Sequence, residues 1–146
     1  MPSSLCVFFP LSPATELIIL STKVGWLDSP HALDATIERI KDVKSTGLDV
    51  GLDFHGRVHR PLAKQLAKAL EPYRPLFIEE PLLPGQVEEI KALYGMTSIP
   101  IALGERLFTR QDARPYFEKG CIDIIQPDIA HAGGISEVKK IATMAE

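Results

Sequence analysis

The sequence predicts an α/β fold, a partial (β/α) barrel of the TIM type with about four consecutive strand–helix units. Short apolar runs alternate strictly with segments whose apolar residues recur at helical spacing. These runs are apolar on both faces, which is typical of a parallel sheet covered by helices. Three of them end in Asp53, Glu79 and Glu105, spaced 26 residues apart, the length of one strand, one helix and two loops.

The first regular element is a helix that begins at Ser29 and Pro30, an N-cap residue and a first helical residue, and ends at Gly47. After it, the pattern predicts strands at 48–53, 76–80, 99–105 and 122–126, and helices at 61–71, 85–94, 109–118 and 135–145. Pro72 and Pro75 end the helix at 61–71, because proline lacks the amide hydrogen that a helix needs.

An open doubly wound sheet fits the same alternation of strands and helices. Its site would lie at one switch point, usually beside a glycine-rich phosphate loop, and no such loop follows the first strand. In a barrel, every consecutive strand can place a residue on the same rim, and Asp128 follows the fourth strand as a further acid. The barrel is therefore preferred. A whole barrel needs about 250 residues, so we expect half a barrel, a fragment of a larger enzyme.

The N-terminal segment does not follow this pattern. Residues 5–20 are apolar enough to suggest a secretory signal, but Pro10, Pro13 and Glu16 interrupt the run and no basic residue precedes it. We expect residues 1–22 to be an irregular leader and residues 23–146 to form the partial barrel domain.

The composition excludes several classes of function. The formal net charge is −3, and basic residues alternate with acidic ones, so the chain offers no basic field for nucleic acid or a membrane surface. The two cysteines, Cys6 and Cys121, show neither metal-ligand spacing nor a disulfide framework. We expect a cytoplasmic protein that binds neither nucleic acid nor membrane.

The three evenly spaced acids predict a metal site. A single acid at a strand end usually caps a helix or lies in a surface loop, but carboxylates on neighbouring parallel strands converge on one rim and repel unless a cation lies between them. Ligands that are all carboxylate oxygens favour Mg²⁺ over zinc. Glu80 adjoins Glu79, and because side chains alternate along a strand only one of the two can face the interior. The even spacing selects Glu79 as the ligand and leaves Glu80 in the loop, solvated, salt-bridged or supporting the site.

Four further residues are candidates for chemistry or substrate contact. His55 lies two residues beyond Asp53 on the same side of the strand, and it is a candidate proton-transfer group because imidazole titrates near neutral pH. Asp128 could orient a general base on the next strand. Arg57 and His131 are weaker candidates, for contact with substrate.

Four segments carry a family resemblance: GLDFHGRVHRP, PLFIEEPLL, IPIALGER and DIIQPDIAHAGGISE. In order and spacing they resemble the barrel of the enolase superfamily, mandelate racemase group, from about Lys23 to Glu146. The resemblance implies a Mg²⁺-dependent dehydratase of sugar acids, which removes the proton α to a carboxylate and expels the β-hydroxyl. It also implies that the chain forms homo-oligomers, as relatives commonly do.

The resemblance assigns roles to individual residues. Asp53, Glu79 and Glu105 would be the Mg²⁺ ligands, His55 matches the histidine that protonates the departing hydroxide, and Asp128 matches the aspartate that pairs with a basic histidine. The family's basic histidine and its capping domain are not within these 146 residues, so we expect little or no dehydratase activity from them. A related dehydratase or racemase for another sugar acid, and a metal-binding fragment without activity, are the alternatives.

Overall fold

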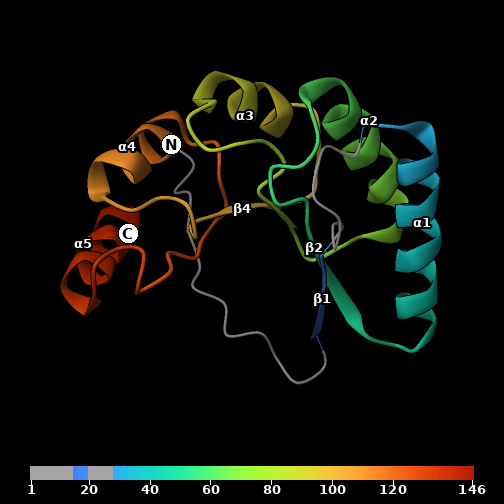
Figure 1. The fold of residues 1–146 in the computed structure, drawn as a ribbon, viewed down its shortest axis with the longest axis horizontal. Coiled ribbons are helices and arrows are strands. Elements are labelled where there is room, and N and C mark those ends of the chain that lie inside the picture. The colour runs from blue at the N-terminus through green and yellow to red at the C-terminus, as the bar shows by residue number, and fades with distance from the viewer. Residues whose placement is uncertain (1–14, 20–27) are drawn as a thin grey trace.

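The computed structural model describes residues 15–19 and 28–146, which form a five-stranded parallel sheet covered by helices. The strands are β1 (Thr15–Ile19), β2 (Asp49–Asp53), β3 (Ile78–Glu79), β4 (Ile101–Leu103) and β5 (Ile124–Ile125). The helices are α1 (Pro30–Ser45), α2 (Arg60–Leu70), the 3₁₀ turn η1 (Glu71–Tyr73), α3 (Val87–Tyr94), α4 (Arg110–Lys119) and α5 (Ile135–Ala145). Figure 1 shows the helices as an outer arc around the strands, from α1 on one side across α2 and α3 to α4 and α5.

The order of the strands in the sheet is their order in the chain, and every neighbouring pair is parallel. Each crossover from β2 onward carries a helix, so the sheet grows in one direction with the helices on one side. A doubly wound sheet would instead reverse its strand order at a switch point. The predicted α/β partial barrel is confirmed.

The strand β1 corrects the expectation of an irregular leader over residues 1–22. Residues Thr15–Ile19 pair in parallel with β2, from Thr15 opposite Asp49 to Ile19 opposite Asp53. The prediction is wrong for these five residues, because pairing with a neighbouring strand is a tertiary property that local pattern does not show. The rest of that leader, residues 1–14 and 20–22, lies outside the described residues.

Local signals explain why the helices lie within two residues of their expected bounds. The Ser29 hydroxyl accepts a hydrogen bond from the Ala32 amide at 3.1 Å and caps α1. Thr109 and Asp112 form a reciprocal capping box at the start of α4. The strands are shorter than predicted. In a run that is buried on both faces, the apolar residues continue past the last backbone pairing, so the sequence pattern does not show where the strand ends. Among the described helices, none is long and apolar enough to cross a membrane.

The core has two layers, one on each face of the sheet, and alternate residues of each strand enter different layers. The large layer lies between sheet and helices and receives Ile78 from β3 and Leu103 from β4. The small layer lies on the inner face and contains Phe77, Ala102 and Ile124. The inner face of the barrel is therefore filled by apolar side chains below the strand ends.

Gly104 is the glycine whose replacement we expect to be most costly to the fold. A Cβ atom built there would overlap the backbone of Gln126, on the neighbouring strand's extension. We expect Gly104→Ala to lower the free energy of unfolding by about 3 kcal/mol, because backbone cannot yield as a flexible side chain can. Urea unfolding followed by circular dichroism measures the loss. Gly95→Ala is the control, since a Cβ there finds its nearest atom at 3.7 Å, and equal losses in the two variants would contradict the prediction.

Candidate metal centre

Two of the three predicted ligands are brought together by strand register. Asp53 ends β2, Glu79 ends β3, and the two residues are direct partners in the sheet. Each is 6% exposed. The partner of Glu79 on β4 is Ala102, so Glu105 lies two residues beyond the end of β4, in the following turn. Its side chain is 36% exposed. The carboxyl ends of three neighbouring strands thus supply the three acids to one rim, as predicted.

Electrostatics shows that these three carboxylates lie close enough to repel one another. Burial, and next the charge of Asp53, raise the pKa of Glu79 to about 7, with Glu105 adding to the effect and a hydrogen bond from the Gln126 side chain opposing it. Burial also raises the pKa of Asp53 and of Glu105. Like charges held together in a partly dry site are what a cation relieves. The donor set of carboxylate oxygens fits Mg²⁺.

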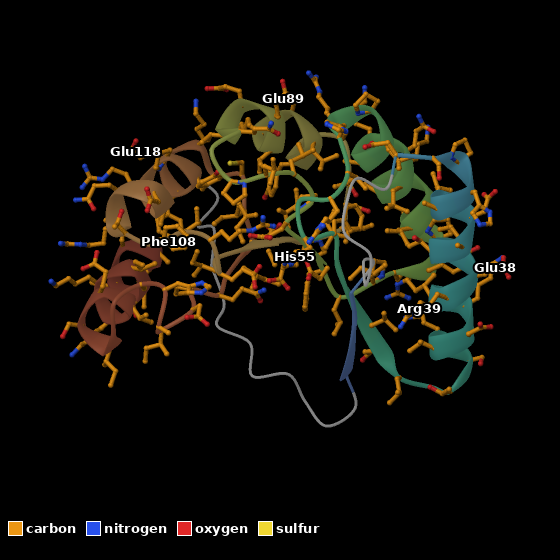
Figure 2. All side chains as sticks on the ribbon, viewed as in Figure 1. Glu38, Arg39, His55, Glu89, Phe108 and Glu118 are labelled. Atoms are coloured by element: carbon orange, nitrogen blue, oxygen red, sulfur yellow. The ribbon has the colours of Figure 1, made fainter. Side chains whose placement is uncertain are left out.

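His55 lies between two of the predicted ligands. Its Nδ1 atom is 3.1 Å from Oδ2 of Asp53 and 3.3 Å from Oε1 of Glu105. Its backbone amide donates to Oδ1 of Asp53 at 2.7 Å, and its φ of 52° turns the chain sharply at the strand end. In Figure 2, His55 lies inside the arc of helices, while Glu38, Glu89 and Glu118 lie on its outside. The turn at the end of β2 therefore places the imidazole of His55 beside the carboxylates of Asp53 and Glu105.

Glu80 forms a salt bridge with Arg106, which is one of the alternatives that the sequence leaves open for it. Its side chain is only 1% exposed, so it is not a solvated loop carboxylate. Both of its oxygens accept hydrogen bonds from Nε of Arg106, at 2.9 and 2.8 Å, and Oε2 also accepts one from Nη2. Glu80 and Arg106 are themselves 26 residues apart. The spacing that identified the three acids could therefore have identified this pair as well.

A second grouping of potential ligands overlaps the predicted one. One ligand atom each from Asp53, His55 and Glu80 lie within 4.8 Å of one another. The Glu80 carboxylate, however, is already bound at both oxygens by a cation. Among residues 15–19 and 28–146, no basic side chain forms an ion pair with Glu79, and its pKa is raised by burial and then by the charges of Asp53 and Glu105. The arrangement favours Asp53, Glu79 and Glu105 as the ligands, with Glu80 beside them.

The remaining candidates lie in the turns around the same rim. Asp128 follows β5 by three residues, is exposed, and accepts at Oδ1 from the amides of Ala130 and His131, both at 2.7 Å. These bonds hold the pKa of Asp128 below its usual value. The His131 Nδ1 atom is 2.9 Å from the backbone oxygen of Glu105. Arg57 is half-buried in the turn after His55. Only His131 among these contacts a predicted ligand directly.

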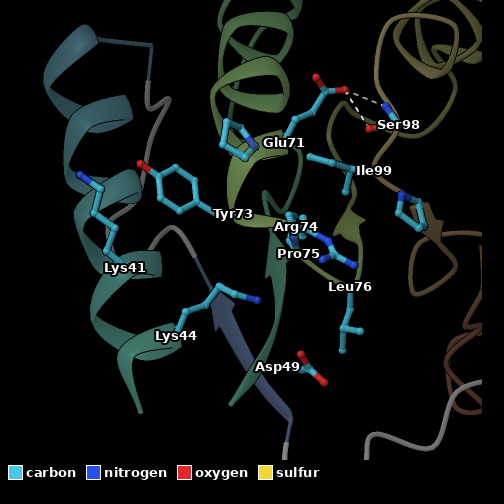
Figure 3. A pocket seen from close by; sticks show the side chains of 12 residues that line it. Lys41, Lys44, Asp49, Glu71, Tyr73, Arg74, Pro75, Leu76, Ser98 and Ile99 are labelled. Atoms are coloured by element: carbon cyan, nitrogen blue, oxygen red, sulfur yellow. Dashed lines mark hydrogen bonds between the residues drawn. The ribbon is translucent and has the colours of Figure 1, made fainter. Parts of the chain in front are cut away.

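A hollow in the described part of the chain lies at the opposite end of the sheet. It measures about 870 Å³ and is lined by residues at the starts of the strands, including Asp49 and Leu76. Figure 3 shows its Glu71 side chain bound to Ser98, whose amide donates at 2.8 Å. That carboxylate is thus occupied in holding a loop. Chemistry in parallel barrels belongs to the carboxyl ends of strands, so the rim with the three acids is the stronger candidate.

Comparisons with known proteins identify the family of the chain. The family model for "Enolase C-terminal domain-like" matches residues 19–146. A D-galactonate dehydratase of Ralstonia pickettii (strain 12J) is 50% identical over 127 residues, and one of Variovorax paradoxus (strain S110) is 51% identical, each match covering 85% of this chain and 33% of the relative. The chain thus spans about a third of the length of these curated relatives.

Solved structures with the same fold include a mandelate racemase/muconate lactonizing enzyme-like protein from Rubrobacter xylanophilus DSM 9941. It has a TM-score of 0.81 and 32% identity, over 88% of this chain and 36% of that one. The 3,6-anhydro-D-galactonate cycloisomerase from Zobellia galactanivorans has a TM-score of 0.78 and 29% identity, over 90% of this chain and 36% of that one. Fold, rim acids and family model lead to one conclusion: the chain belongs to the enolase C-terminal domain-like family, within the enolase superfamily.

Proposed function

We propose that this chain supplies the metal-binding half of a Mg²⁺-dependent sugar-acid dehydratase that acts on D-galactonate. The observation that carries the proposal is the convergence of three carboxylates and one imidazole on a single rim of the parallel sheet. The relatives named D-galactonate dehydratase, about 50% identical, support the choice of substrate. Asp53, Glu79 and Glu105 would hold the ion, which when bound acts as a Lewis acid toward the substrate carboxylate.

The residues of the chain would divide the remaining work. With Nδ1 of His55 held by carboxylates, Nε2 is the atom from which the ring would hand a proton to the departing hydroxyl. Asp128 would orient a basic histidine that these residues do not include. His131 and Arg57 border the same rim and would contact the sugar acid. We therefore expect metal and substrate binding from this chain, with little or no turnover.

Calorimetric titration with MgCl₂ and then with D-galactonate tests the proposal. We expect one Mg²⁺ per chain, and sugar-acid binding that requires the metal. A panel of sugar acids, including 3,6-anhydro-D-galactonate, tests the choice of substrate, and a 2-keto-3-deoxy acid assay measures any turnover. Absence of Mg²⁺ binding would contradict the proposed metal site. Preference for another sugar acid would retain the site and reject D-galactonate. Turnover at the rate of an ordinary dehydratase would show that the base is present after all.

A further inference from the structure

Resting on the proposed metal site, we propose that Glu80 is a positioning residue which engages the hydrogen bonds of the Arg106 guanidinium and so keeps it from binding the nearby ligand Glu105 directly. In this inference Glu80 is not a ligand itself. It is the counter-ion that keeps an adjacent cation from taking the place of Mg²⁺.

The contacts of Arg106 show what has to be held. Its Nε atom lies 3.8 Å from Oε1 of Glu105, the next residue back and a predicted ligand. Its Nη2 atom lies against Gly56, where a Cβ would approach it to 3.1 Å. The guanidinium therefore lies across the turn that follows His55 and beside the metal rim. The guanidinium is already within ion-pair distance of Glu105, and a modest movement would let it donate a hydrogen bond to that carboxylate.

Glu80 holds the guanidinium in this place through geometry and burial. Two carboxylate oxygens facing the guanidinium fork form a directional, charge-assisted arrangement that a point charge does not provide. The Glu80 backbone reinforces it, since its N–H donates to Ala102 at 3.0 Å and its C=O accepts from Gly56 at 2.8 Å. The Glu80 carboxylate is thus fixed between β4 and the turn after His55. The Glu80 carboxylate could therefore not move with Arg106 if the guanidinium shifted.

Removing the charge of Glu80 and removing the charge of Arg106 should have opposite effects on the affinity for Mg²⁺. Without the negative charge of Glu80, Arg106 is a free cation next to Glu105, and it competes with Mg²⁺ for that carboxylate. Without the positive charge of Arg106, Glu80 is an additional anion near Asp53 and His55, and it attracts Mg²⁺. Removal of both charges leaves the rim close to its original balance. If the ion pair only stabilised the fold, removing either charge would change the affinity for Mg²⁺ in the same direction.

Isothermal titration with MgCl₂ tests the inference on Glu80→Gln, Arg106→Gln, the double variant and Arg106→Lys, each checked by circular dichroism for a native fold. We expect affinity to fall about tenfold in Glu80→Gln and to stay equal or rise in Arg106→Gln. The double variant should return to within about threefold of the parent. Arg106→Lys should weaken binding, because a lysine keeps the charge and loses the fork. Arg60→Gln, which removes the ion pair with Glu89 at 2.7 Å, is the matched control and should leave affinity unchanged.

Each other outcome overturns the inference in a recognisable way. A double variant as weak as Glu80→Gln, with Arg106→Gln unaffected, would make Glu80 a ligand. Parallel losses in both single variants would make the pair structural only, and no change in any variant would give it no role. If Glu80→Gln does not fold, the comparison of the two Arg106 variants decides: Arg106→Lys should weaken Mg²⁺ binding and Arg106→Gln should not, and any other result overturns the inference. A Glu79→Gln variant that still binds Mg²⁺ would instead reject the metal site on which the inference rests.

Discussion

Replacing Glu79 with glutamine is expected to lower the affinity for Mg²⁺ by about 100-fold, since ligand charge largely sets the strength of an oxygen site. Among the predicted ligands, Glu79 has the largest pKa shift, because burial and the charge of Asp53 raise its pKa to about 7. Glutamine keeps the shape of the side chain and its hydrogen-bonding capacity toward Gln126. The loss therefore reports the missing negative charge and not a collapsed strand end.

Calorimetry with MgCl₂ measures this effect, and the metal-free variant should unfold at least as cooperatively as the parent. Glu118→Gln is the control, because the Glu118 side chain is 70% exposed on α4 and lies on the outside of the helix arc. Equal affinity in the parent and in Glu79→Gln would remove Glu79 from the ligand set. The alternative grouping of Asp53, His55 and Glu80 would then be the one to test.

The second large effect is a loss of stability of the metal-free protein as pH rises. The pKa of Glu79 is 4.5 in its ordinary state and about 7 in the folded chain. A carboxyl whose pKa is raised by folding binds its proton more tightly in the native state, so its stabilising contribution is complete below pH 4.5 and is lost as pH rises through 7. Because solvent reaches part of the site, we expect the free energy of unfolding to fall by about 1–2 kcal/mol between pH 5 and pH 8.

Urea unfolding in EDTA at several pH values measures this fall. The informative quantity is the difference between the parent and Glu79→Gln, since carboxyls with lowered pKa, such as Asp128 and Glu137, contribute equally to both. The parent should lose stability across this range, and the variant should lose much less. Saturating Mg²⁺ should abolish the slope in the parent by binding the ionised form. A slope that persists unchanged in Glu79→Gln would place its origin elsewhere.

Local sequence was a sound guide wherever structure depends on neighbours in the chain. Ser29 with Pro30 predicts the start of a helix through contacts within three residues, and the structure confirms it. Thr109 and Asp112 mark the start of α4 through contacts of the same range. Strand β1 was missed because its stability comes from pairing with β2, across a segment of some thirty residues. The roles of His55, Arg57, Asp128 and His131, the cytoplasmic location and the homo-oligomer stay predictions.

The sequence by itself determined the class of the fold and the identity of the rim acids, because strict alternation and a 26-residue spacing survive in any right-handed array of strand–helix units. Only the tertiary structure decided where the carboxylate of Glu80, the second of the two adjacent acids, lies. Alternation along one strand could assign a single inward position, whereas the backbone turns at Glu80 with a φ of 42° and carries its carboxylate to Arg106. That choice depends on a cation from the next strand end. A contact between side chains 26 residues apart exists only once the strands are side by side.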